Sequence, residues 1–314
     1  MAVLFAYFFV VLIWATTPLT IQWSSDSLSF IAAVLLRMSF ALALGLLINA
    51  LLRRKLFSHP QAWQVYAAGA IGIFPNMPVV YWSAQYIPSG LVAVIFAMSP
   101  FVTGFMSFVM LKQNPFTRRR LLALLMAVAG LVIIFHQQIQ LNAQAAYGIA
   151  GILLSCFLFG FSSVLVKKLS ITTDAFNQTL GSLLFSLPGL LLLWWLIDGV
   201  LPGSVSTKSL AAVGYLSVFG SLLGFTLFFY VLRNMSPSAV SLITFMTPVL
   251  ALLLGAWLGH ESLTWPLWLG ASLVVLALLV YLDLSGDHIF FSMLKRDAWF
   301  GDPLQMKHDY HRFK

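Results

Sequence analysis

Residues 95–101 read IFAMSPF, and residues 243–249, which lie 148 positions later, read ITFMTPV. Each copy follows a short segment containing Pro and Ser, and in each a Met-Ser-Pro or Met-Thr-Pro step interrupts an apolar run. A polar end at residues 112–113 or 260–261 comes next, and then a second apolar run. Similarity at one long offset indicates an internal repeat, which must be recognised before the fold is predicted. The chain is therefore expected to consist of two related halves.

The composition is typical of a protein that crosses a membrane many times. Of the 314 residues, 61% are hydrophobic and 8% are charged, whereas about 25% are charged in a soluble domain. The one cysteine, Cys156, lies in an apolar run, which excludes an intramolecular disulfide and a cysteine-based metal site. The N-terminal apolar segment lacks a basic region and a small-residue cleavage motif, so we expect a first spanning helix there instead of a signal peptide.

Ten segments are apolar and long enough to span a bilayer, which takes about 20 helical residues. They lie at about 3–22, 28–52, 62–84, 89–111, 119–137, 147–167, 174–197, 208–231, 237–259 and 265–284. With five spans per copy, an odd number, the second copy has the opposite orientation. The predicted fold class is therefore all-α integral membrane, with ten transmembrane helices in two inverted five-helix repeats. The repeats are expected at 1–140 and 145–284, followed by a cytoplasmic tail at 285–314.

The basic residues predict the orientation of these spans. Of the 17 Lys and Arg residues, all but Arg37 and Lys208 fall on one side of the ten-span topology. Basic loops stay in the cytoplasm, so we expect a multi-pass protein of a bacterial-type inner membrane with both termini cytoplasmic. Since the positive charge follows the topology, the net charge of +8 does not indicate nucleic-acid binding.

Three pieces of sequence carry a family resemblance. They are the Trp-Ala and Phe-Gly steps at 14–15 and 159–160, the YIPS turn at 86–89, and GHESLT at 259–264, which is followed by Gly270. Together they resemble the EamA branch of the drug/metabolite transporter (DMT) superfamily over about residues 2–284. The resemblance implies a central cavity lined by segments 1, 3, 4, 6, 8 and 9, with segments 5 and 10 packed at the side. It also implies alternating access and export of small metabolites, such as amino acids, or of drugs.

One departure from the family concerns ion coupling. Similar transporters often carry a Glu where this chain has Gln113, which weakens a mechanism based on two symmetric carboxylates. We therefore expect that Glu261, at a predicted helix end, is not a proton carrier.

Sequence motifs of enzymes are scarce. The chain has no Asp-rich pair, no HExxH, no phosphate-binding loop and no GxSxG, and none of its nine acidic residues is placed at mid-membrane. We predict a transporter and not an enzyme, with no cofactor and no metal. Its expected partners are a small-molecule substrate and the lipid bilayer, not nucleic acid, and a homodimer is left open. Metabolite uptake, and less strongly a membrane enzyme or lipid-binding scaffold, are the alternatives.

The third segment contains the sharpest site candidate. It reads GIFPNMP at residues 72–78, near the middle of the span. Its two prolines cannot donate backbone hydrogen bonds, and a broken backbone at membrane depth is tolerated only where protein or a cavity satisfies it. Transporters place substrate sites at such interruptions. The Asn76 amide can donate and accept, so it either contacts substrate or only satisfies the freed carbonyl of Gly72 or Ile71.

Other candidates come from charge, aromatic character and spacing. Arg37 is a charge inside a span, which costs about 3 kcal/mol at a helix centre. It either reaches the outer interface along its own length or contributes to cavity electrostatics. Small residues line one face of segment 9, where they either pack against a helix or form a cavity wall with hydroxyl donors. The predicted substrate-binding residues are Asn76, Trp14, Tyr81, Thr244, Ser241 and Arg37, with Thr247 as a further donor.

Overall fold

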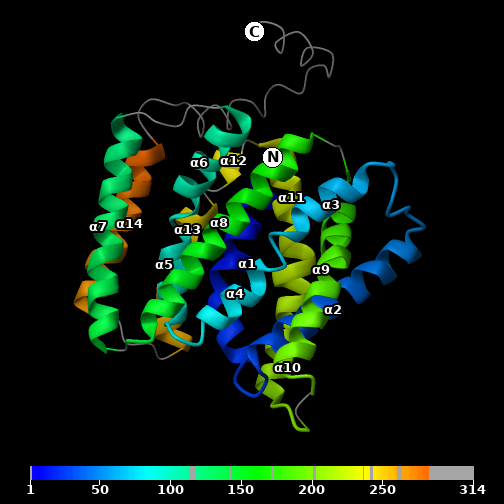
Figure 1. Ribbon diagram of the computed structural model, residues 1–314, viewed down its shortest axis with the longest axis horizontal. Coiled ribbons are helices and arrows are strands. Elements are labelled where there is room, and N and C mark those ends of the chain that lie inside the picture. Colours follow the sequence, from blue (N-terminus) through cyan, green and yellow to red (C-terminus); the bar gives the residue numbers. More distant parts are fainter. Residues whose placement is uncertain are drawn as a thin grey trace, which may run out of the picture.

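The computed structural model describes residues 2–112, 118–141, 143–170, 173–200, 203–235, 237–240, 243–259 and 264–282. Every regular element in these residues is a helix (Figure 1). The elements are α1 (Ala2–Ser24), α2 (Phe30–Leu51), α3 (Ala62–Ala70), α4 (Asn76–Ser83), α5 (Ser89–Phe96), α6 (Ser99–Leu111), α7 (Arg118–Leu141), α8 (Ala145–Leu169), α9 (Ala175–Ile197), α10 (Thr207–Tyr215), η1 (Leu216–Leu223), α11 (Gly224–Asn234), α12 (Pro237–Val240), α13 (Ile243–Leu258) and α14 (Trp265–Leu282). The predictions for Gln113, Ser241, Glu261 and the tail fall outside the described residues.

The all-helical class predicted from the sequence is confirmed, and several helices can cross a membrane. Within the described ranges, six stretches are long and apolar enough to do so: Ala2–Ser24, Phe30–Leu51, Ser89–Leu111, Ala145–Leu169, Ala175–Ile197 and Thr207–Asn234. Two shorter apolar stretches, Leu121–Ile134 and Trp265–Ala277, accompany them. The count of ten spans and the boundaries of the two repeats stay predictions.

Polar side chains mark where three helices begin. Ser29 accepts a hydrogen bond from the Ala32 backbone at the start of α2, Asp174 accepts one from Asn177 at α9, and Ser206 caps α10. Such caps satisfy N–H groups that lack a partner within the first helical turn. The polar loop residues thus define the helix ends that the apolar pattern alone placed only approximately.

Three of the predicted spans that lie wholly within the described residues are interrupted and are not continuous α-helices. Residues 71–75 separate α3 from α4, as the prolines indicated, and the Phe74–Pro75 peptide bond is cis. The span at 89–111 breaks between α5 and α6, where Pro100 lies in the first turn of α6. The span at 208–231 widens into the π-helix η1, a rare element that is often found at functional sites.

Helices α7 and α14 pack along each other at one edge of the molecule (Figure 1). A Cβ on Gly130 would lie 2.6 Å from the Gly270 carbonyl oxygen, and one on Gly270 would lie 2.7 Å from the Gly130 oxygen. The two glycines therefore allow backbone-to-backbone contact, a common way of joining helices in lipid. This is the lateral position that the family resemblance implied for segments 5 and 10. Helix α1 packs against α5, α10, α11 and α13 in the other part of the molecule.

Candidate functional site

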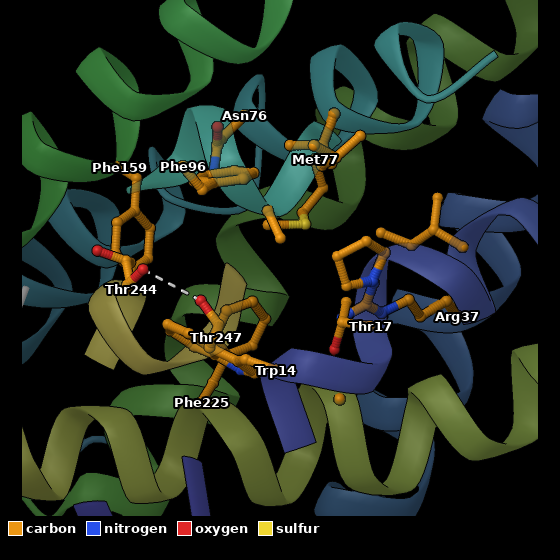
Figure 2. Close-up of a pocket in the computed structure, with 16 residues that line it drawn as sticks. Trp14, Thr17, Arg37, Asn76, Met77, Phe96, Phe159, Phe225, Thr244 and Thr247 are labelled. Carbon is orange, nitrogen blue, oxygen red and sulfur yellow. Dashed lines mark hydrogen bonds between the residues drawn. The ribbon is translucent and has the colours of Figure 1, made fainter. Parts of the chain in front are cut away.

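A pocket with a volume of about 80 Å³ lies where eight of these elements meet (Figure 2). The lining residues are Trp14, Thr17, Pro18 and Ile21 of α1; Arg37 of α2; Asn76, Met77 and Val80 of α4; Val92, Ala93 and Phe96 of α5; Phe159 of α8; Gly220 of η1; Phe225 of α11; and Thr244 and Thr247 of α13. A buried water takes roughly 10–15 Å³ of such space, so the pocket holds several waters or a small solute. All six segments implied by the resemblance contribute to it, and α2 contributes in addition.

Aromatic rings form one wall of the pocket. The Trp14 ring centroid lies 5.7 Å from that of Phe159 and 6.4 Å from that of Phe225, both edge-on, and 5.3 Å from that of Phe228. Edge-on packing at these distances is favourable and holds the indole in one orientation. A Cβ on residue 224 would lie 3.0 Å from the Trp14 indole nitrogen, so Gly224 leaves room for this ring.

Arg37 lies inside the protein, with 1% of its surface exposed. Its Nε donates to the Ser221 hydroxyl at 2.8 Å, and Nη1 donates to the Tyr81 hydroxyl at 3.3 Å. The guanidinium carbon also lies 5.9 Å from the centre of the Tyr81 ring. The alternative in which Arg37 extends to the outer interface is therefore not the arrangement that the structure adopts.

The π-helix η1 supplies the groups beside Arg37. Ser221 of η1 accepts its hydrogen bond, and a Cβ on the neighbouring Gly220 would lie 3.1 Å from Nη2. The contact joins residues that are 184 positions apart in the chain. The wide turn and the glycine together make the space that the guanidinium occupies.

Asn76 is fully buried, and both ends of its amide are bonded to protein. Nδ2 donates to the Gly72 carbonyl at 2.9 Å, and the Ser155 hydroxyl donates to Oδ1 at 2.5 Å. The alternative role, satisfying the Gly72 carbonyl freed by the prolines, is thus present. Asn76 also lines the pocket, so it contributes to the wall while its polar atoms are engaged elsewhere.

The remaining predicted residues divide into three cases. Thr244 and Thr247 line the pocket together, and the Thr247 hydroxyl donates to the Thr244 carbonyl at 3.2 Å (Figure 2). Tyr81 is not a lining residue and reaches the site only through its bond to Arg37. Ser241 lies outside the described residues.

Several pocket residues were not among the sequence candidates. Thr17, Phe96, Phe159 and Phe225 line the pocket alongside the predicted set. A signal existed for Phe159, because it begins the Phe-Gly step that matches Trp-Ala at 14–15. The other aromatic residues resemble ordinary apolar helix residues, and no sequence pattern distinguishes them.

Metal chemistry has no evident site in the described part of the chain. No group of three or more His, Cys, Asp or Glu side chains is found there that could hold a metal ion. The arrangement is an apolar, aromatic chamber with hydroxyl groups and one guanidinium, which is suited to binding a small organic molecule.

Comparison with known proteins finds relatives that are named as transporters. The chain is 27% identical over 290 residues to the uncharacterized inner membrane transporter YedA of Escherichia coli strain K12, covering 91% of each chain. It is 27% identical over 225 residues to Protein PecM of Dickeya dadantii, covering 71% of this chain and 74% of PecM. It is 26% identical over 273 residues to an uncharacterized transporter of Archaeoglobus fulgidus, covering 85% and 94%.

The fold is shared with proteins of known structure, among them one described by its crystal structure. The TM-score is 0.67 at 17% identity, and the match covers 89% of this chain and 96% of that one. The model of the EamA-like transporter family matches residues 1–136 and again residues 146–282. Membrane-spanning helices together with inner membrane transporters as relatives indicate a multi-pass inner membrane protein and a membrane transporter. The chain belongs to the EamA-like transporter family.

Proposed function

We propose that this protein is a secondary transporter that exports small neutral or zwitterionic metabolites, such as amino acids, or amphipathic drugs by alternating access. One observation carries the proposal: a small aromatic pocket lies where eight helical elements from both parts of the chain meet, beside an interrupted helix. Transporters bind their substrates at such sites near the membrane midplane. The direction, export, rests on the family resemblance alone.

The proposed topology has ten spans in two inverted repeats, with both termini cytoplasmic. The spans are α1, α2, α3 with α4, α5 with α6, α7, α8, α9, α10 through α11, α12 with α13, and α14. Two ion pairs are consistent with the loops that this topology places on the same side of the membrane. Arg54 pairs with Asp174 on the predicted cytoplasmic side, and Lys208 pairs with Asp26 on the opposite side. Reporter fusions after Lys55 should be cytoplasmic and fusions after Ser204 should not. One swapped position would refute the inverted repeat.

The transport proposal is tested with detergent-purified protein and proteoliposomes. A thermal-shift screen of amino acids, nucleosides, sugars and cationic drugs should identify solutes that stabilise the protein, and proteoliposomes should then carry these solutes across the membrane. Trp14→Ala should abolish the ligand-dependent stabilisation. The matched control is Trp195→Ala, since Trp195 is 67% exposed and is not among the residues that line the pocket.

The outcomes separate the candidate functions. Stabilisation that survives Trp14→Ala would show that the pocket is not the binding site. Chemical conversion of a solute without movement across the membrane would favour the enzyme alternative. Accumulation only in the opposite direction to export would assign the protein to uptake.

A further inference from the structure

The guanidinium of Arg37 has more hydrogen-bonding capacity than the protein uses. Nε and Nη1 donate to Ser221 and Tyr81, while Nη2 has no hydrogen-bond partner among the described residues. A guanidinium offers a planar set of N–H donors that fits a carboxylate with two parallel bonds. Arg37 lines the pocket, and Nη2 lies beside Gly220, which lines it too.

The charge of Arg37 is also not balanced by a carboxylate. In the described part of the chain, its hydrogen-bond partners are two neutral hydroxyls, and it forms no ion pair. It is the one ionisable side chain among the residues found to line the pocket. A buried charge is costly unless it is paired, so an anionic group on the solute would relieve a cost that two hydroxyls and the Tyr81 ring offset only in part.

The rest of the pocket does not suit a second charge. Arg37 and Thr17 lie at one side of the pocket and Phe159 and Thr244 at the other, with Trp14 and Thr247 between them (Figure 2). The aromatic wall favours an apolar group, and the described lining has no carboxylate that could receive an ammonium. Arg37 would moreover repel a cation at this short range.

We propose that the pocket recognises small organic acids, with the solute carboxylate bound to Arg37 and its apolar part against Trp14 and Phe159. The proposal rests on the proposed function and changes its substrate class: carboxylates without an ammonium group are preferred over zwitterions, and cationic amphipathic drugs are not substrates.

The test uses three probes with the same aromatic carbon skeleton: phenylacetate, phenylacetamide and phenethylamine. Affinities are measured by titration calorimetry on the purified full-length protein, and flux is measured in proteoliposomes. Wild type should bind phenylacetate roughly tenfold or more tightly than the amide, because hydrogen bonds between charged groups are the stronger kind. Phenethylamine should bind more weakly than the amide.

Variants assign the preference to Arg37. Arg37→Gln should reduce the acid-over-amide ratio to about one, and Arg37→Lys should keep part of it, because it retains the charge without the planar fork. Lys208→Gln is the control, since it removes one positive charge at an exposed site away from the pocket. If Arg37→Gln does not fold, Gly220→Ala tests the same point, because its Cβ would lie 3.1 Å from Nη2 and displace the guanidinium.

Each outcome bears on one proposal or the other. Equal binding and equal flux of acid and amide would overturn the carboxylate site and leave transport intact. A preference for acid that persists in Arg37→Gln, or wild type that binds none of the three probes, would also overturn it. Stabilisation by chloride alone that depends on Arg37 would assign an inorganic anion instead. Arg37-dependent binding of phenylacetate without flux would support the site and contradict the transport function.

Discussion

Two helix irregularities, around Gly72 and around Gly220, lie 148 residues apart and differ in how their polar groups are paired. Around Gly72, the chain breaks between α3 and α4, and Asn76 binds the freed carbonyl of Gly72. Around Gly220, the chain remains helical but widens into η1, and Ser221 binds Arg37. Both glycines face a polar side chain at the same distance, since a Cβ would lie 3.1 Å from Ser162 Oγ at Gly72 and 3.1 Å from Arg37 Nη2 at Gly220.

The difference lies in how completely the polar groups are satisfied. In the first region the Asn76 amide is bonded at both ends, to Gly72 and Ser155, and its polar atoms are closed off by the protein. In the second region Nη2 of Arg37 is left without a partner among the described residues. The comparison teaches that an interruption of a membrane helix is not itself a binding group. The group left unsatisfied beside it is the better candidate.

The largest expected loss of stability comes from substitutions in the first region, around Gly72. Asn76→Leu should lower the free energy of unfolding in detergent by roughly 2–4 kcal/mol, because it leaves two buried polar partners unsatisfied. Ser155→Ala removes one of the two hydrogen bonds and should cost about 1 kcal/mol. Thermal melting of the purified variants measures both. Normal stability of Asn76→Leu with a lost ligand response would instead assign Asn76 to substrate contact.

The second largest loss of stability is expected at the C-terminus of α11, the helix that follows η1 in the second region. Lys167 Nζ donates to the carbonyls of Leu232, Arg233 and Met235, at 3.0, 3.1 and 3.0 Å, at the C-terminus of α11. Lys167→Met should cost about 1–2 kcal/mol of stability, because a cation is lost from carbonyls that have no helical partner. The neighbouring exposed residue is the control, and Lys168→Met should change stability by less than about 0.5 kcal/mol. Equal melting temperatures for the two variants would show that this cap is not stabilising.

A matched pair of glycine substitutions sharpens the comparison. Gly72→Ala and Gly220→Ala each place a methyl group against a tightly packed neighbour, so each should cost about 1 kcal/mol of stability. Only Gly220→Ala should also lower the preference for phenylacetate over phenylacetamide. Melting and calorimetry on the same preparations separate the two effects. A loss of preference in Gly72→Ala of the same size would mean that both regions bind the solute.

The smallest change in stability is expected at an exposed ion pair near the start of α10, the helix that precedes η1. Lys208 Nζ lies 3.4 Å from Asp26 Oδ2, and both side chains are more than half exposed. Exposed pairs contribute little, so Lys208→Gln should change stability by no more than about 0.5 kcal/mol. A larger change in the melting temperature would indicate that this end of the protein is held together by charge.

Local sequence was informative wherever the chemistry is local. The prolines at 75 and 78 predicted the break between α3 and α4 because proline removes a backbone donor whatever surrounds it. Arg37 was recognised because a charge in an apolar run is costly in any fold. With Trp14, Asn76 and Thr244, it lies around one pocket, although only their residue types and positions in the spans suggested this.

The sequence by itself determined that the protein is an all-helical membrane protein and indicated its family, because hydropathy and short motifs are properties of the linear chain. Only the tertiary structure decided which candidates keep free polar atoms. Ser155 engages Asn76 across 79 residues, and Ser221 engages Arg37 across 184, so each pairing depends on how helices distant in the chain pack. The same packing brought Phe159 and Phe225 beside Trp14. Contacts of this kind leave no local pattern, because any apolar or small polar residue on those helix faces would look the same in the sequence.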